Sequence, residues 1–135
     1  MSPRYLFDTD TCIYWLKGDA DIEKRVAEMG LEHIGLTAIT LCELYYGAFK
    51  SDRKKGNLET IENLVKKLLV IPADRKSAPF FGEIKADLEK AGRALDDADL
   101  LIASVALAHG AVLVTNNASH FNRISNLAIE TWGRP

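Results

Sequence analysis

The chain has 135 residues, of which 47% are hydrophobic and 27% are charged, and its formal net charge is −2. This length fits one domain spanning 1–135, and the slightly acidic balance gives no global argument for a nucleic-acid binder. No apolar run reaches the roughly 18 residues that a membrane span needs. The N-terminal stretch is too short and too soon acidic for a secretory signal, so we expect a cytoplasmic protein without membrane contact.

Predicted strands and helices alternate along the whole chain. In the first half we expect a strand at 4–8, helices at 11–17 and 19–30, a strand at 33–39 and a helix at 40–51. In the second half we expect a helix at 57–69, a strand at 70–73, helices at 76–92 and 97–108, and strands at 111–115 and 127–132. This alternation is typical of an α/β domain with a central parallel sheet flanked by helices.

Two neighbouring segments in the second half are expected to lie in the core. The helix at 97–108 is apolar on nearly every face, and the strand at 111–115 is apolar throughout. A helix that is hydrophobic all round is buried, and a continuously apolar strand is typical of a parallel sheet covered on both faces.

Polar side chains lie where predicted strands end or where the helices after them begin. They are Asp8, Glu43, Asp96, Asp97, Asp99, Thr115, Asn116 and Asn117. In a parallel sheet these positions share the edge at the carboxyl ends of the strands, where functional groups gather. Four separate chain segments would then meet there in one acidic cleft.

Helix capping is an alternative explanation for each of these residues. Thr40-x-x-Glu43 has the spacing of a capping box, in which Glu43 would accept a hydrogen bond from the Thr40 N–H. Asp96 suits the N-cap of the helix that follows it, and acids such as Asp97 and Asp99 suit the dipole of a first turn.

Capping does not explain the acids taken together. Thr9, Asp10 or Asp8 can cap the helix at 11–17. Capping needs only one of them, yet the first strand ends on Asp8 and is followed directly by the other two. Crowded carboxylates raise one another's pKa unless a cation intervenes. An all-oxygen ligand set without a cysteine or histidine cluster favours a hard cation such as Mg²⁺ or Mn²⁺. Such a cleft fits phosphodiester hydrolysis by a water that the metal activates.

Three blocks of the chain together resemble the PIN domain, and specifically the VapC-type toxins of bacterial toxin–antitoxin pairs. They read "YLFDTDTCIYWLKG", "LTAITLCELYYGAFKS" and "GRALDDADLLIASVALAHGAVLVTNNASHFNRISNLAIETW". The likeness runs essentially end to end, with the same order and spacing of blocks. It implies a PIN-like fold and a Mg²⁺- or Mn²⁺-dependent endoribonuclease that cuts RNA, with transfer RNA as the leading substrate.

The resemblance also implies partners. Such a toxin inhibits translation and growth until a cognate VapB-type antitoxin neutralises it. It is usually a homodimer, can enter a larger toxin–antitoxin complex, and reaches operator DNA only through the antitoxin.

Residue by residue, the resemblance implies a set of site positions. The metal-binding and catalytic acids are Asp8, Glu43 and Asp99. Thr9 and Thr115 match small polar residues that line the family's site. Asp97 matches a position that is often polar or acidic and could bind metal through water, while Asp96 is left as the N-cap.

The sequence departs from the family pattern after Thr115. Many members carry a fourth acid there, whereas this chain has Asn116 and Asn117, with His120 further on. An amide oxygen, as of Asn117, can still ligate a metal or position a water, but it brings no negative charge, which weakens the case for a second metal. His120 could contact phosphate or act as an acid or base near neutral pH.

Further residues on the helix at 40–51 share the face of Glu43. Tyr46 and Lys50 lie three and seven positions along, so we expect them beside the cleft and near RNA phosphates. Trp15 and Tyr45 are candidate anchors for the antitoxin, or alternatively core residues.

Two other functions compete with a nuclease. A phosphoryl-receiver domain would need a lysine at the end of the last long strand, and neither "VLVTNN" nor "AIETW" supplies one. A catalytically weak PIN scaffold that acts by binding RNA or protein would be expected if the acids were missing, and only the fourth position lacks one.

Overall fold

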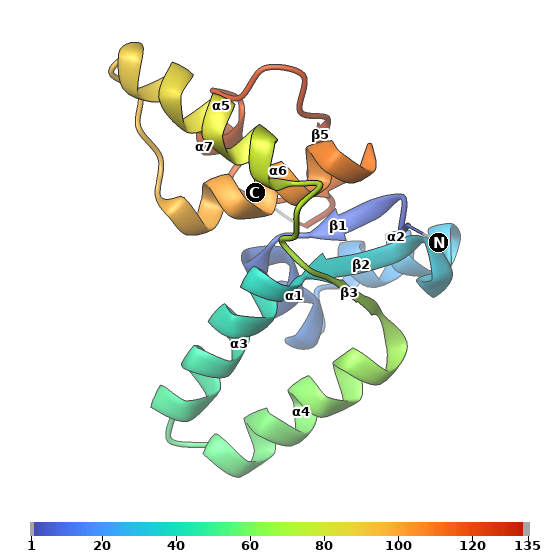
Figure 1. Ribbon diagram of the computed structural model, residues 1–135. Helices are drawn as coiled ribbons and strands as arrows, with labels where there is room; N and C mark the ends of the chain where they lie inside the picture. Colours follow the sequence, from blue (N-terminus) through green and yellow to red (C-terminus); the bar gives the residue numbers. More distant parts are fainter. Residues whose placement is uncertain (1, 134–135) are drawn as a thin grey trace.

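The computed structural model describes residues 2–133 and consists of a parallel sheet with helices on both faces (Figure 1). Met1, Arg134 and Pro135, which the predicted domain 1–135 includes, lie outside the described residues. The elements in chain order are β1 (Tyr5–Phe7), α1 (Thr9–Leu16), α2 (Ala20–Met29), a short 3-10 helix η1 (Leu31–His33), β2 (Ile34–Thr37), α3 (Ala38–Lys50), α4 (Lys54–Lys67), β3 (Leu69–Ile71), α5 (Ala78–Lys90), α6 (Asp97–His109), β4 (Val112–Val114), α7 (Ala118–Phe121) and β5 (Ile129–Glu130).

The sheet has five strands in the order β3-β2-β1-β4-β5, and every neighbouring pair is parallel. β1 is therefore central, with β2 on one side and β4 on the other. The chain builds the sheet outward from β1 through β2 to β3, and then continues on the opposite side with β4 and β5. The predicted α/β class with a central parallel sheet is confirmed.

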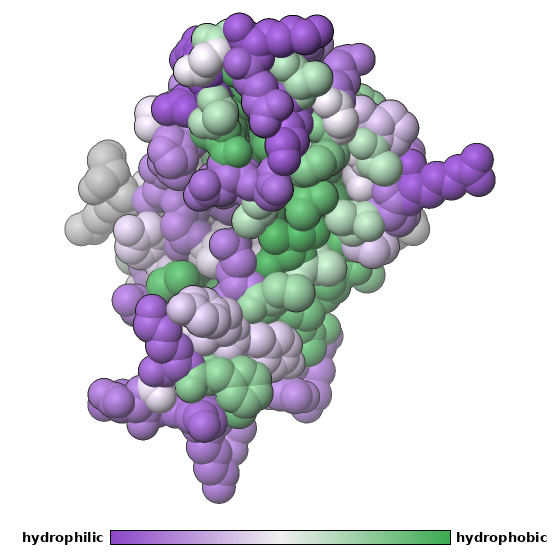
Figure 2. All heavy atoms as spheres, turned by 60° about the vertical axis from the view of Figure 1, so that its left-hand side comes forward, coloured by the Kyte–Doolittle hydropathy of each residue, from purple (hydrophilic) through white to green (hydrophobic). Residues whose placement is uncertain are grey.

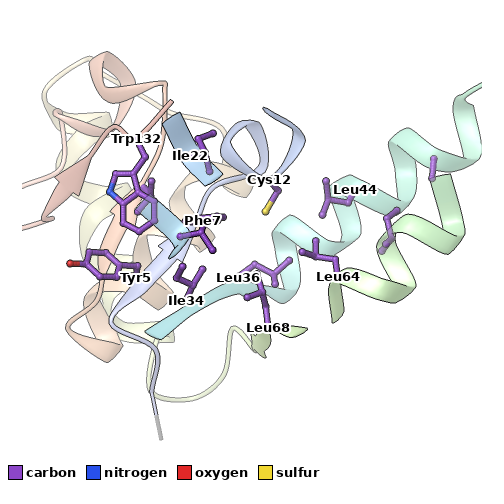
Figure 3. Packing of buried hydrophobic residues seen from close by; sticks show 14 residues of the cluster. Tyr5, Phe7, Cys12, Ile22, Ile34, Leu36, Leu44, Leu64, Leu68 and Trp132 are labelled. Carbon is purple, nitrogen blue, oxygen red and sulfur yellow. The ribbon is translucent and has the colours of Figure 1, made fainter. Parts of the chain in front are cut away.

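Alternate residues of β1 supply the two halves of the core. Tyr5 and Phe7 pack with buried residues of α1 to α4, whereas Leu6 packs on the other face with α5, α6 and α7. This alternation follows from the period of two along a strand. Figure 3 shows the first cluster, in which Trp132 lies against both aromatic residues of β1, with ring centroids 5.0 and 5.3 Å apart.

Helix α6 is the buried helix that its composition predicts. Its side chains from Ile102 to Ala106 are all buried. The one hydroxyl among them, that of Ser104, donates a hydrogen bond to the Leu100 carbonyl at 2.6 Å. The helix ends at Gly110, whose φ of 60° is the left-handed conformation that glycine adopts at helix ends. No helix within residues 2–133 is both long and apolar enough to cross a membrane.

The helix starts differ from the predicted ones by up to three residues, as at α4, which begins at Lys54 rather than at residue 57. Helix α1 begins at Thr9, and its N-cap is Asp8 rather than Thr9 or Asp10. Helix α3 begins at Ala38, two residues before the predicted start, because the Thr37 hydroxyl accepts a hydrogen bond from the Thr40 N–H at 3.1 Å. The predicted cap at Thr40 is therefore wrong.

Candidate active site

The carboxyl ends of β1 and β4 meet at the point where the strand order reverses. Crevices at such switch points are the usual ligand sites of open parallel sheets. The Asp8 N–H donates to the Val114 carbonyl at 2.9 Å, and the Thr115 hydroxyl donates to Asp8 Oδ2 at 2.8 Å. Asp8 and Thr115, which lie 107 positions apart in the chain, are thus joined directly.

The Asp8 carboxylate is held in a nearly closed environment. Its side chain accepts hydrogen bonds from the Thr9 N–H and the Thr115 hydroxyl, and the residue is only 6% exposed. Burial, followed by the charge of Asp10, raises the pKa of Asp8 from 3.8 to about 7. The two hydrogen bonds act in the opposite direction but do not compensate. A nearby cation would stabilise the ionised form of this buried carboxylate and lower its pKa.

Glu43 reaches the site through Thr9. The Thr9 hydroxyl donates to Glu43 Oε1 at 2.5 Å and lies 3.3 Å from the Thr40 hydroxyl. Because α3 starts at Ala38, Glu43 lies in its second turn, and the Thr40 N–H is already bonded to Thr37. The predicted capping box between Thr40 and Glu43 is therefore not formed. Glu43 faces the first strand's carboxyl end instead.

Asp99 enters from the first turn of α6 and lies next to His120. The distance between Asp99 Oδ2 and His120 Nδ1 is 3.8 Å, and the Asn117 amide nitrogen lies 2.9 Å from the same ring nitrogen. Burial, followed by the charge of Glu43, raises the pKa of Asp99. Asp99 and Glu43 are thus close enough for their charges to interact.

Helix α7, which carries His120, does not appear among the predicted elements. It is only four residues long and is anchored by the fully buried Phe121. At its start the Asn117 N–H donates to the Thr115 hydroxyl at 2.9 Å. A single turn with one apolar anchor leaves too little periodicity for a sequence pattern to indicate it.

The structure adds Asp10 to the predicted residues of the site. Its Oδ2 accepts from the Asn116 N–H at 3.1 Å, and its Oδ1 lies 3.3 Å from the Thr11 hydroxyl. Asp10 therefore ties the segment after β4 to the start of α1. The signal in the sequence is the run Asp8-Thr9-Asp10, in which the second acid looked like a helix cap.

We expect the hydrogen bond of Asp10 to contribute measurably to stability. Asp10→Ala removes both the charge and the acceptor, whereas Asp10→Asn removes the charge and keeps an acceptor for the Asn116 N–H. Urea unfolding should therefore find Asp10→Ala less stable than Asp10→Asn by about 1–2 kcal/mol. Equal stabilities of the two variants would contradict this role.

Three predicted site residues make their contacts away from the carboxyl ends of β1 and β4. The Asp97 carboxylate pairs with Lys85 Nζ at 2.9 Å and is largely exposed. Tyr46 and Lys50 lie on the outer face of α3, with the lysine ammonium 5.3 Å from the ring centroid. A water-mediated role for Asp97 and a phosphate-binding role for Lys50 stay predictions.

A groove of about 340 Å³ runs from Glu43 between α1, α3 and α4. Its walls include Ile13 and Leu16 of α1 and Ile61 of α4, so the groove is apolar beyond its acidic end. Trp15 and Tyr45, the predicted anchors, are partly buried against the core instead.

The residues at this edge suit a divalent cation by their chemistry. Asp8, Glu43 and Asp99 are oxygen donors from three separate segments, and both acids with a raised pKa are among them. Within residues 2–133, no three His, Cys, Asp or Glu side chains already converge as a set of metal ligands. The fit therefore rests on donor type and on the crowding of negative charge.

Residues 5–127 match the PIN domain family. The chain belongs to this family. It is 36% identical to the ribonuclease VapC2 of Rickettsia felis over 132 residues, which cover 96% of this chain and 98% of that protein. It is 34% identical to the tRNA(fMet)-specific endonuclease VapC of Salmonella typhimurium over 129 residues, again 96% and 98% of the two chains. The resemblance to VapC-type PIN domains is thereby confirmed.

Solved structures of VapC-type PIN domains have the same fold. A chain of the VapBC2 complex of Rickettsia felis, bound to a DNA fragment from its promoter, superposes with a TM-score of 0.88 at 35% identity, over 95% of this chain and 98% of that one. A chain of the DNA-bound VapBC complex of Salmonella typhimurium gives 0.91 at 35% identity, over 98% and 99%.

Proposed function

We propose that this PIN domain is the endoribonuclease toxin of a VapBC-type pair and hydrolyses phosphodiester bonds of RNA. The observation that carries the proposal is the pair Asp8 and Asp99. These two acids come from segments far apart in the chain, lie in the region of the strand-order reversal, and both have a raised pKa. Acids with perturbed pKa in such a crevice are typical of a functional site.

We propose Mg²⁺ or Mn²⁺ as the cofactor, held by Asp8, Glu43 and Asp99. Bound to these carboxylates, such an ion would activate a water for attack on phosphorus and offset the charge that develops there. Asn117 offers an amide oxygen after Thr115, where the resemblance to VapC-type toxins implies a fourth acid. It can orient a water but adds no charge, so one firmly held ion is the simpler arrangement.

The remaining polar residues orient these acids. Thr115 donates to Asp8, and Thr9 donates to Glu43, so each hydroxyl limits the rotation of one carboxylate. His120 stands beside Asp99, where its ring can contact a phosphate oxygen or move a proton near neutral pH. Asn116 connects this group to Asp10 through its backbone N–H.

We propose a VapB-type antitoxin as the protein partner and transfer RNA as the substrate. The DNA-bound complexes of the two relatives contain both toxin and antitoxin, and one relative is named for cleavage of tRNA(fMet). The groove that leads from Glu43 between α1, α3 and α4 is the surface that suits an antitoxin segment. Operator DNA would then be reached through the antitoxin, and a homodimer remains part of the proposal.

The test is expression in cells with and without a candidate VapB-type antitoxin, followed by sequencing of RNA 5′ ends. We expect growth arrest and new ends at one position in transfer RNA, both reversed by the antitoxin. Unchanged RNA during growth arrest would contradict the nuclease and favour the catalytically weak scaffold, for which the missing fourth acid is the one argument.

A further inference from the structure

The far end of the hairpin formed by α3 and α4 carries two aromatic rings in solvent, each next to a lysine. Tyr46 is 67% exposed with Lys50 5.3 Å from its ring centroid, and Phe49 is 58% exposed with Lys54 5.9 Å from its ring centroid. In Figure 2 this end is the lower part of the molecule, where weakly polar and apolar side chains are bordered by hydrophilic ones. We call this surface, made of the four residues, the hairpin tip.

The hairpin tip contributes little to the stability of the fold. Neither ring belongs to a core cluster, and the one ring contact of Phe49 is with Tyr45, at 6.5 Å between centroids. A cation–π pair at an exposed site stabilises a protein less than burying such a side chain would. Internal stability therefore does not explain why two large rings point outward.

The charges around the rings also lack a local reason. Arg53 and Lys55 join Lys54 at the start of α4, where the first turn has no acid and only Asp52, directly before Arg53, offsets these charges in the segment 50–55. Cations at a helix N-terminus oppose the helix dipole. In a chain with a net charge of −2, this local excess of positive charge suits an external anion.

The combination of flat rings and lysines selects one class of ligand. Unpaired bases stack on aromatic side chains while lysines neutralise the adjoining phosphates, which is the construction of single-strand binding surfaces. A duplex keeps its base faces stacked inside, and an acidic peptide would use the lysines but leave the rings unused. We propose that the hairpin tip binds single-stranded RNA, with bases on Tyr46 and Phe49 and phosphates at Lys50 and Lys54.

The tip is placed to extend the proposed active site, and the inference rests on the nuclease function proposed above. Tyr46 and Lys50 lie one and two turns beyond Glu43 on the same helix, so Lys50 is about 10 Å further along the axis. An RNA strand held at the tip would thus continue toward Glu43. The substrate that fits is an unpaired RNA loop in which nucleotides beside the cleaved bond also bind the protein.

The experiment measures binding of a fluorescein-labelled, unstructured 15-nucleotide RNA to the full chain carrying Asp99→Asn, so that the probe is not cut. In this background Tyr46→Ala and Phe49→Ala are each expected to weaken binding by about 5- to 150-fold, the range for loss of one stacked base. Lys50→Met and Lys54→Met should each reduce the slope of log affinity against log salt by about 0.7. When the same RNA is annealed into a duplex, Tyr46→Ala and Phe49→Ala should bind it as the parent chain does, because paired bases leave no free face for the rings.

Two control variants replace the same types of side chain at positions away from the hairpin tip. Phe80 is an exposed aromatic residue of α5, 38% exposed, and Lys90 is an exposed lysine at the end of the same helix. Phe80→Ala and Lys90→Met should bind the probe as the parent chain does. Thermal melting of every variant shows that a loss of affinity is not a loss of fold.

The outcomes separate this inference from the proposed function. If the unmutated chain cuts RNA but the tip variants bind the probe unchanged, the hairpin tip is not an RNA site. If the tip variants instead turn a dimer into monomers in analytical ultracentrifugation without loss of RNA affinity, the surface joins two copies and the inference is wrong. If the unmutated chain neither cuts nor binds RNA, the nuclease proposal itself fails.

Discussion

Asp99→Asn is expected to abolish RNA cleavage while the domain stays folded. The substitution keeps the shape of a half-buried side chain in the first turn of α6 but removes one of the proposed ion-binding charges. Loss of a residue that merely supports a metal ligand commonly costs 10- to 100-fold, so loss of the ligand should exceed about 100-fold. The measurement is the initial rate of cleavage of a transfer RNA in Mg²⁺ or Mn²⁺, with circular dichroism as the test of folding.

Asp87→Asn is the matched control for Asp99→Asn. Asp87 is an exposed aspartate of α5, and its replacement makes the same change of charge away from the strand ends. This variant should cleave at the rate of the unmutated protein. Cleavage by Asp99→Asn at the unmutated rate in the presence of excess EDTA would rule out the metal-dependent mechanism.

Asp8→Asn is expected to stabilise the protein at high pH and to have little effect at low pH. Because burial raises the pKa of Asp8 from 3.8 to about 7, the folded chain retains a proton that the unfolded chain releases. The penalty for ionising this buried acid is absent below pH 4, grows as the pH rises to 7, and is complete above it. A pKa of about 7 in place of 3.8 corresponds to a loss of folding stability of about 4 kcal/mol at high pH.

The stability of both proteins is measured by urea unfolding between pH 4 and pH 8 in EDTA. Asparagine keeps an acceptor for the Thr9 N–H, so the N-cap of α1 survives. Its amide nitrogen replaces the oxygen that accepts from the Thr115 hydroxyl, and the loss of this hydrogen bond affects stability at every pH, whereas the effect of the charge changes with pH. At pH 8, added Mn²⁺ should stabilise the unmutated chain and have little effect on Asp8→Asn. A stability difference between the two that does not change with pH would contradict the raised pKa.

Elements whose structure depends on neighbouring residues can be predicted from the sequence. The strand before Asp8 and the buried helix before Gly110 follow from short apolar runs and from residues that end helices. The exact residues at which helices begin are harder to predict. Thr37 rather than Thr40 caps α3, although both threonines suit an N-cap by residue type. A choice between equivalent local caps depends on where the preceding strand ends.

The acids of the site illustrate the same division between local and long-range information. Asp97 and Asp99 are two positions apart, and residues on a helix turn by 100° each, so the two side chains point in widely different directions. Only the packing of α6 against its neighbours determines that Asp97 pairs with Lys85 while Asp99 lies beside His120.

By itself the sequence determined the alternation of strands and helices, the order of the three blocks typical of the PIN family, and the identity of the acids beyond the strands. These features depend on residue type and on short spacing. The tertiary structure decided that Asp10 binds the segment after β4 and that Thr115 holds Asp8 across 107 positions of chain. It also decided that two aromatic rings of α3 remain outside the core. Such contacts depend on strand order and helix packing, which no local pattern contains.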